Sequence, residues 1–188
     1  MIKFVAKAIL PTRFGEFDIC AFKEGENEHI VLIKGELKQG ILVRVHSKCF
    51  TGDTLGSLRC DCRKQLEKSL ELIAKEGGML IYLDQEGRGI GLANKIRAYS
   101  LQDSGLDTVD ANKELGFHND PRDYSSAAKI LAHFSIKRIR LLTNNPKKTS
   151  GLEGNGIKIE RIPLLTEPNK YNKRYMETKK RRMNHLIE

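Results

Sequence analysis

The sequence predicts a mixed α/β protein of the α+β type, with a β-rich N-terminal part followed by alternating strands and helices. Three observations support this prediction. The first quarter of the chain contains four segments rich in Val, Ile, Leu and Phe, separated by turn-forming residues. After residue 60, amphipathic helical patterns alternate with short apolar strands. The 188 residues are 39% hydrophobic, which is enough for one domain with its own core.

The N-terminal quarter is expected to form four strands, because segments containing glycine or proline separate its apolar runs. Lysines interrupt the first apolar run, which indicates a strand rather than a signal peptide. Cys20, in the second strand, has no metal-like neighbour and is expected to be a buried thiol. The four expected strands span residues 2–9, 16–23, 28–34 and 41–46.

A helix is expected at residues 61–76, after a loop. Leu66, Leu70 and Ile73 recur at helical spacing and would form its apolar face. Two consecutive glycines follow the pattern and are expected to end the helix. The later elements are expected as a strand at 79–83, a Gly-rich turn at 84–91, a helix at 92–104, a short helix at 110–115, an amphipathic helix at 124–135, a strand at 138–143, a short helix from 147 and a strand at 157–164.

The charge of the chain suggests a polyanionic partner. We expect one domain over residues 1–166, then a basic tail over residues 167–188 whose Lys179–Arg182 run is a solvated or frayed helix end. The net charge of +9 favours either a nucleic acid or a nucleotide phosphate. The absence of Trp and the 6% aromatic content argue against a stacking platform for single-stranded nucleic acid.

The sequence contains no export or membrane signal. No run of about 18 apolar residues occurs, so no membrane span is expected. We therefore expect reduced cysteines, for which metal binding or catalysis is favoured over disulfide bonds.

Three of the four cysteines, Cys49, Cys60 and Cys62, lie close together in the sequence. Structural zinc usually has four protein ligands, whereas catalytic zinc usually has three and an open position. The spacing therefore suggests an open zinc site, although His46 as a fourth ligand would close it. Two of these cysteines fall at the start of the expected helix, where the helix dipole favours thiolates and the turn lets both reach one ion.

The segment 84–91 lies between an expected strand and an expected helix. Such Gly-rich turns can direct backbone N–H groups at an anion. The segment lacks the third glycine of a dinucleotide fingerprint and the Gly-Lys-Ser/Thr of a P-loop. A plain glycine turn is therefore an equally good interpretation of this segment taken alone.

Taken together and in order, the motifs of this chain resemble those of GTP cyclohydrolase II over about residues 5–165. The segment 44–62, which contains the three cysteines, and the Gly-rich segment carry the resemblance, and shorter motifs support it. These are Arg44-Val45-His46-Ser47, Cys49, Thr51-Gly52-Asp53, Leu58-Arg59-Cys60-Asp61-Cys62, Gln85 to Leu92, Asn94 to Tyr99, Leu101-Gln102-Asp103, Asp107-Thr108, Ala111-Asn112, Leu115-Gly116-Phe117, Arg122-Asp123 and Leu141 to Lys148.

The resemblance implies a cytoplasmic homodimer, with residues 1–166 as the catalytic domain and no fused partner domain. The family opens the imidazole ring of GTP and releases formate and pyrophosphate. The remaining product is 2,5-diamino-6-(5-phosphoribosylamino)pyrimidin-4(3H)-one, the first intermediate of riboflavin biosynthesis. One zinc ion per subunit acts on the ring, and magnesium accompanies the substrate phosphates. Neither a membrane nor a nucleic acid is expected as a partner.

The resemblance also implies roles for individual residues. The zinc ligands would be Cys49, Cys60 and Cys62, and the catalytic residues Tyr99, Asp120 and Arg122. The GTP contacts would be Arg44, Val45, His46, Ser47, Lys48, Gln65, Glu86, Gly87, Arg88, Thr108, Thr143 and Lys148.

Several of these roles have simpler alternatives. For Arg44, Arg88 and Lys148, an ordinary surface cation is the favoured interpretation of each residue taken singly. Tyr99 also suits a packed aromatic residue with its hydroxyl at the rim. Asp120 and Arg122 match the family's proposed base and nucleophile, but they also suit a pair that caps the next helix. Because arginine stays protonated in proteins, a clamp on the α-phosphate is the role we favour for Arg122.

The chain differs from the usual family pattern at Lys48, Arg63 and Asp84, where Glu, Gly and Arg are common. The first two add positive charge beside the cysteines. A divergent homologue that acts on another nucleotide or stops at a different product is therefore an alternative. A zinc-stabilised nucleic-acid-binding module is an alternative from another class.

Overall fold

The structure is a computed structural model that describes residues 1–117 and 122–186. It divides the chain into two compact units. The first unit contains residues 1–46, 66–84 and 123–164, and the second contains residues 47–65, 85–122 and 165–188. Along the chain, each of the three segments of the second unit comes after a strand of the first unit.

The first unit is built on a seven-stranded mixed sheet, as expected for an α+β protein. Its strand order is β1-β2-β3-β5-β4-β6-β7. The pairs β1–β2, β2–β3 and β3–β5 are antiparallel, whereas the pairs β4–β6 and β6–β7 are parallel. The strands are β1 (Lys3–Thr12), β2 (Gly15–Glu24), β3 (Asn27–Lys34), β4 (Ile41–Ser47), β5 (Gly78–Leu83), β6 (Arg138–Leu142) and β7 (Lys158–Ile162).

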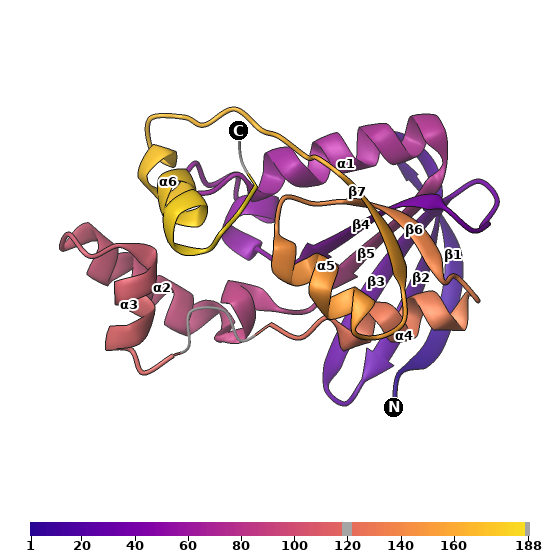
Figure 1. Cartoon of the computed structure of the whole chain (residues 1–188), viewed down its shortest axis with the longest axis horizontal. Helices are drawn as coiled ribbons and strands as arrows, with labels where there is room; N and C mark the ends of the chain where they lie inside the picture. The colour runs from indigo at the N-terminus through magenta and orange to yellow at the C-terminus, as the bar shows by residue number, and fades with distance from the viewer. Residues whose placement is uncertain (118–121, 187–188) are drawn as a thin grey trace. The chain divides into compact units, whose positions relative to one another are not determined.

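Helices cover both faces of this sheet (Figure 1). Successive residues of a strand point to opposite faces. Leu80 accordingly joins a cluster with Leu70 and Ile73 of α1 (Cys62–Glu76), and Ile81 joins a cluster with Ile130 of α4 (Ser125–His133). The second cluster also contains Leu152 of α5 (Pro146–Glu153), so α4 and α5 share one face and α1 covers the other.

The strands and helices of this unit agree closely with those expected from the sequence. The strand β1 is longer than expected, because it continues through Pro11 to Thr12 and only two residues form the turn before β2. Proline is tolerated there since β1 is an edge strand of the sheet. Cys20 is 1% exposed and free, which confirms the expected buried thiol.

The described residues of the second unit form three helices and two short helical turns. The helices are α2 (Gly91–Asp103), α3 (Thr108–Glu114) and α6 (Lys173–Arg182), and the turns are Phe50–Thr54 and Glu86–Gly89. The expectation of a wholly solvated basic run is wrong at Lys179, which is only 7% exposed and pairs with Asp61. The tail is thus partly a packed helix, because a buried carboxylate offsets the charge of that lysine.

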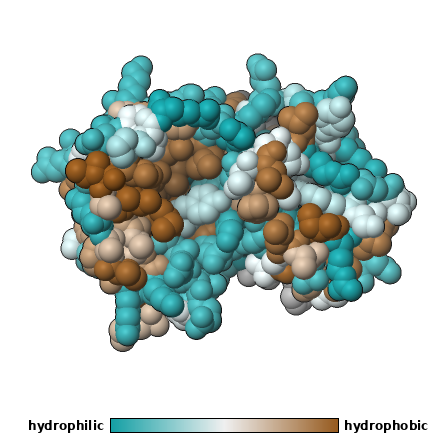
Figure 2. All heavy atoms as spheres, turned by 180° about the vertical axis from the view of Figure 1, so that it is seen from behind, coloured by the Kyte–Doolittle hydropathy of each residue, from teal (hydrophilic) through white to brown (hydrophobic). Residues whose placement is uncertain are grey.

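The surface shows two further features. Apolar side chains gather in patches on the face drawn in Figure 2, and those exposed on β1 include Phe4, Val5 and Ile9. No helix in the described part of the chain is long and apolar enough to cross a membrane.

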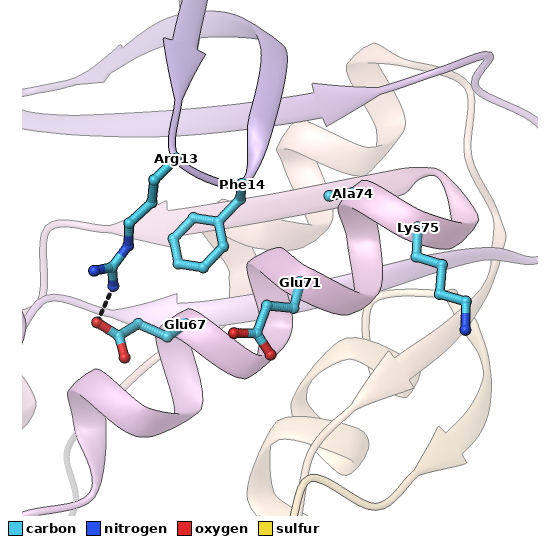
Figure 3. Close-up of a pocket in the computed structure, with 6 residues that line it drawn as sticks. All are labelled: Arg13, Phe14, Glu67, Glu71, Ala74 and Lys75. Atoms are coloured by element: carbon cyan, nitrogen blue, oxygen red, sulfur yellow. Dashed lines mark hydrogen bonds and ion pairs between the residues drawn. The ribbon is translucent and has the colours of Figure 1, made fainter.

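Figure 3 shows a groove beside α1 lined by Arg13, Phe14, Glu67, Glu71, Ala74 and Lys75. None of the predicted site residues that the structure describes lines this groove.

Candidate metal centre and substrate-binding residues

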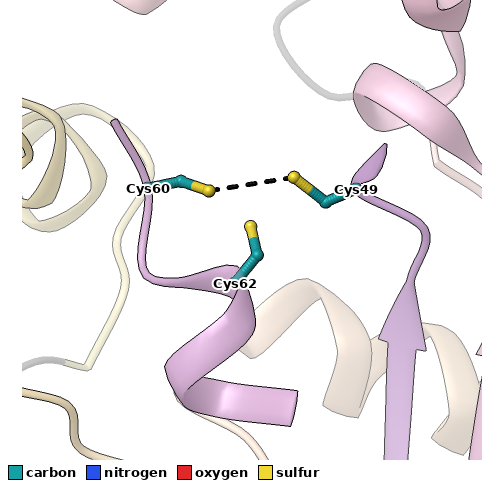
Figure 4. A group of neighbouring side chains, drawn as sticks. All are labelled: Cys49, Cys60 and Cys62. Carbon is teal, nitrogen blue, oxygen red and sulfur yellow. Dashed lines mark hydrogen bonds between the residues drawn. The ribbon is translucent and has the colours of Figure 1, made fainter. Parts of the chain in front are cut away.

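The sulfur atoms of Cys49, Cys60 and Cys62 converge in the second unit (Figure 4). All three lie within 4.8 Å of one another, and the sulfurs of Cys49 and Cys60 are 3.7 Å apart. Zinc–sulfur bonds of about 2.3 Å in a tetrahedral site place two sulfurs roughly 3.8 Å apart. The three residues therefore fit one tetrahedrally coordinated ion with a fourth position left for another ligand.

The turn Phe50–Thr54 brings Cys49 to the other two cysteines. The Asp53 carboxylate accepts a hydrogen bond from the Cys49 amide at 3.0 Å and closes the turn. A Cβ atom on Gly52 would lie 2.9 Å from the Cys60 sulfur and 3.0 Å from the Cys49 sulfur. Only glycine fits this position, which accounts physically for the Thr-Gly-Asp motif.

Lys95 of α2 supplies a positive charge beside the sulfurs. Its Nζ lies 3.0 Å from the Cys49 sulfur and 2.8 Å from Glu86 Oε1, and its side chain is 11% exposed. Burial alone would lower the pKa of Lys95, but the hydrogen bond to Glu86 and the charge at Cys49 raise it above its ordinary value. Lys95 is therefore a permanent cation at this centre.

Hydrogen bonds among the three thiols shift their pKa values. Hydrogen bonds with Cys60 and Cys62 lower the pKa of Cys49, and the bond with Cys49 raises the pKa of Cys60 to about 12. The bond with Cys49 also raises the pKa of Cys62. A metal ion that binds all three sulfurs must therefore displace protons from Cys60 and Cys62, whose pKa values are raised.

Tyr99 of α2 contacts the turn Phe50–Thr54. Its hydroxyl is 3.2 Å from Thr51 Oγ1, which is itself 3.8 Å from the Cys49 sulfur. The Arg59 guanidinium stacks 4.9 Å from the ring centroid. Burial raises the pKa of Tyr99 to about 12, so the hydroxyl is a neutral donor at ordinary pH.

Glu86 hydrogen-bonds the Gly-rich segment to the turn Phe50–Thr54. The carboxylate of Glu86 is only 9% exposed and accepts hydrogen bonds from the amides of Phe50, at 2.6 Å, and Gly87, at 2.9 Å. Gly87 and Arg88 both adopt left-handed backbone conformations, with φ of 61° and 65°. Arg88 lacks the freedom of glycine, and such strain is typical of functional sites.

Other predicted contact residues in the second unit have local structural roles. Gln65 donates to the Asp61 carboxylate at 2.5 Å. Thr108 begins α3 directly after Asp107, whose side chain caps that helix. Ser47 donates to the Gln85 side chain at 3.2 Å, and Lys48 is half-buried.

A separate group of predicted contacts lies at the carboxyl ends of β4 and β6 in the first unit. Arg44 is 4% exposed and donates to the Leu142 carbonyl at 2.9 Å. Lys148 of α5 is 5% exposed and donates to the Val45 carbonyl at 2.6 Å. These cations are buried in the protein, so the alternative of ordinary surface cations does not describe them.

His46 and Thr143 complete this group. The His46 ring stacks on Tyr82 with centroids 5.5 Å apart, and its Nδ1 lies 3.5 Å from an Arg44 nitrogen. The Thr143 hydroxyl accepts a hydrogen bond from the Asn145 amide at 3.0 Å, at the turn that begins α5. Of the expected catalytic residues, Arg122 is half-buried, and Asp120 lies outside the described residues.

Sequence reasoning missed four residues of the metal centre: Thr51, Gly52, Asp53 and Lys95. All four lie within motifs that carry the family resemblance, so the signal was present in the sequence. The roles of Thr51 and Lys95 depend on contacts between distant segments, such as that of Lys95 with Cys49, 46 residues earlier, and spacing alone does not reveal those contacts. The roles of Gly52 and Asp53 depend on the local shape of the turn that follows Cys49.

The chain is similar to proteins of one family. A model of the GTP cyclohydrolase II family matches residues 3–163. The GTP cyclohydrolase-2 of Campylobacter hominis is 55% identical over 100% of this chain and 95% of that protein. The GTP cyclohydrolase-2 of Picrophilus torridus is 54% identical over 100% of each chain. The riboflavin biosynthesis protein RibBA of Chlorobium phaeovibrioides is 53% identical over 98% of this chain and 47% of that protein.

The fold and the three thiols define a mixed α/β protein with a cysteine cluster that could hold a metal ion. With these relatives over its whole length, the chain belongs to the GTP cyclohydrolase II family. This membership confirms the resemblance seen in the sequence and the expectation of a hydrolase.

Proposed function

We propose that this protein is a zinc-dependent GTP cyclohydrolase II that opens the imidazole ring of guanine. Formate and pyrophosphate would be released, and the diaminopyrimidinone product would enter riboflavin biosynthesis. The observation that carries this proposal is the group of three cysteine sulfurs within 4.8 Å of one another, in a chain of this family.

Zinc would be held by Cys49, Cys60 and Cys62, whose donor set suits that ion. When bound with an open position, zinc supplies Lewis acidity and lowers the pKa of water towards neutrality. The Lys95 ammonium beside the Cys49 sulfur offsets part of the negative charge of three thiolates. This cation would keep the centre electrophilic.

Tyr99 is proposed to donate a hydrogen bond or a proton to the opening ring. Its hydroxyl is neutral at ordinary pH and lies one hydrogen-bonded residue, Thr51, away from the ligand Cys49. A positioned neutral donor contributes most when it meets charge that develops in the transition state.

The substrate phosphates require cations, and we propose Arg44, Lys148 and Arg122 for this role together with magnesium. Arg122 would act as a clamp on the α-phosphate, because a guanidinium offers paired N–H donors and no free lone pair. Asp120 is proposed to hold Arg122 in place. The remaining proposed GTP contacts are Val45, His46, Ser47, Lys48, Gln65, Gly87, Arg88, Thr108 and Thr143.

Glu86 is proposed to recognise the guanine base in addition to its structural role. Its carboxylate accepts three hydrogen bonds within the protein, from Phe50, Gly87 and Lys95. A carboxylate offers about four acceptor positions. One position therefore remains for an N–H group of guanine.

We also propose a cytoplasmic homodimer. The apolar side chains exposed on the edge strand β1 support self-association, because an unpaired strand edge can pair with another chain. Light scattering coupled to size-exclusion chromatography should give twice the 21.3 kDa of one chain. A mass of one chain would contradict this part of the proposal.

Incubation of the purified protein with GTP, zinc and magnesium tests the reaction. Equal amounts of formate and pyrophosphate support the proposed function. Formate without pyrophosphate, or turnover of another nucleotide only, would favour the divergent homologue suggested by Lys48 and Arg63. No turnover, together with salt-dependent binding of RNA or DNA, would favour the nucleic-acid-binding module.

Replacing a zinc ligand tests the metal centre. We expect Cys60→Ser to abolish formate release while the circular dichroism spectrum stays that of folded protein. Cys20→Ala removes the one thiol outside the centre and should retain formate release. A Cys60→Ser protein that opens the ring at the wild-type rate would rule out the ligand assignment.

A further inference from the structure

The C-terminal helix α6 reaches the residue between two of the zinc ligands. Asp61, flanked by Cys60 and Cys62, is 1% exposed. Its Oδ1 accepts a hydrogen bond from Lys179 Nζ at 2.6 Å, and the Lys179 side chain is 9% exposed. Neither charge is accessible to water, so each needs the other to remain ionised in the folded protein.

The second oxygen of Asp61 is also engaged. Gln65 Nε2 donates to Oδ2 at 2.5 Å, and Thr166 Oγ1 donates to it at 3.3 Å. Asp61 therefore joins the first turn of α1 to the C-terminal segment, and its backbone carries a cysteine ligand on either side. A shift of Asp61 would move both sulfurs.

The segment before α6 is tied to the same loop. Asn169 Nδ2 donates to the Leu58 carbonyl at 3.2 Å, and Lys64 Nζ donates to the Glu167 carbonyl at 3.1 Å. These bonds lie just before and just after the two cysteines. The C-terminal segment thus holds residues 58–64 at both ends.

Two other contacts of α6 reach predicted GTP-binding segments. Two cations lie over the Tyr175 ring, Lys179 at 4.6 Å and Arg88 of the Gly-rich segment at 5.9 Å from its centroid. Arg182 pairs with Asp107, the capping residue of α3, and with Asp110 at 2.9 Å. The helix α6 therefore contacts Asp61 between the two cysteines, the Gly-rich segment and the start of α3.

We propose that α6 is a positioning element of the metal centre, in which Lys179 acts through Asp61 to hold Cys60 and Cys62 at ligand distance. This inference rests on the proposed function in one respect, since it takes the three cysteines as metal ligands. Groups that orient ligands from outside the first coordination sphere typically change metal affinity when they are replaced.

The test compares Lys179→Met with Lys180→Met, which removes the neighbouring, exposed lysine of the same helix. Cobalt(II) ion is the probe, because its absorption spectrum reports the number and arrangement of thiolate ligands. We expect Lys179→Met to weaken cobalt binding by about tenfold or more and to change the ligand-field bands. Lys180→Met should match wild-type protein in both respects.

Two further measurements separate positioning from general stability. Hydrogen–deuterium exchange of metal-free protein should be faster over residues 57–65 in Lys179→Met than in Lys180→Met. Lys179→Gln keeps a hydrogen-bond donor for Asp61 and should partly restore the cobalt spectrum. If Lys179→Met does not fold, Lys179→Gln is compared with wild-type protein in its place.

Wild-type cobalt affinity, spectrum and exchange in Lys179→Met would overturn the positioning role. The proposed function fails separately when wild-type protein binds cobalt through its thiolates but releases no formate from GTP. Both fail together when wild-type protein shows no thiolate–cobalt absorption.

Discussion

Gly52 and Lys95 show how the space and charge around three sulfur atoms determine the neighbouring residues. Gly52 lies where any side chain would meet two sulfurs, and Lys95 lies where a cation meets both a sulfur and a carboxylate. Neither residue is a candidate ligand, yet both contact the cysteine sulfurs directly.

Gly52→Ala should loosen the centre. The added methyl group would lie 2.9 Å from the Cys60 sulfur, so the turn Phe50–Thr54 must move. We expect unfolding to be easier by about 1–3 kcal/mol and zinc to bind more weakly in a chelator competition. Thr54→Ala, at an exposed position of the same turn, is the control and should change neither quantity. Unchanged zinc affinity in Gly52→Ala would contradict the close packing at this glycine.

Lys95→Met should impair both stability and activity. Methionine has a similar length but leaves the Glu86 carboxylate buried without its cation. We expect a loss of roughly 3–5 kcal/mol in the free energy of unfolding and about a hundredfold slower formate release. Denaturant titration and a formate assay measure these effects, with the exposed Lys113→Met as control. An active, stable Lys95→Met protein would show that the cation is dispensable.

At the scale of single elements, local sequence patterns were sufficient for most strands and helices. Alternating apolar residues and turn signals located β1 to β4, and helical spacing located α1 and α4. The pattern around α6 was misleading, because four consecutive basic residues are typical of a solvated end. Lys179 is buried only because Asp61 lies beside it, 118 residues earlier in the chain, and no local pattern reports such a pair.

The docking of α6 on α3 should depend on pH through Asp107 and Asp110. Burial acts to raise the pKa of Asp107, but hydrogen bonds from backbone amides and Arg182 lower it below its ordinary value of 3.8. The hydrogen bond from Arg182 also lowers the pKa of Asp110. Groups with lowered pKa values stabilise the fold above about pH 4 and lose this effect as the pH falls through the folded-state pKa.

Arg182→Gln tests this dependence. We expect a lower midpoint of thermal unfolding than wild type at pH 7, and a smaller difference at pH 3, where the carboxylates are protonated. Arg181→Gln, at the adjacent exposed position, should match wild type at both pH values. A difference between Arg182→Gln and wild type that stays constant from pH 7 to pH 3 would contradict the ion pairs.

At the scale of the whole molecule, the residues predicted from the sequence to bind metal or substrate are divided between the two units. The sheet of the first unit carries Arg44, His46 and Lys148 at the carboxyl ends of its parallel strands or just after them. The second unit carries the three cysteines, Lys95 and Tyr99.

The sequence did not predict the strand order, in which β5 lies between β3 and β4. That order consists of pairings between strands far apart in the chain, such as β3 with β5 and β4 with β6, which local patterns do not encode. The ligands themselves could be predicted, because cysteine spacing is a local property and the motif order identified the family.

A zinc titration of ring opening tests the central claim most directly. Protein stripped of metal by a chelator is supplied with GTP and magnesium, and formate release is followed as zinc is added. We expect no formate without zinc and a rise that saturates at one zinc ion per chain. Formate release at the full rate in the stripped protein, or saturation unrelated to the number of chains, would contradict the proposal that the three cysteines hold a working zinc ion.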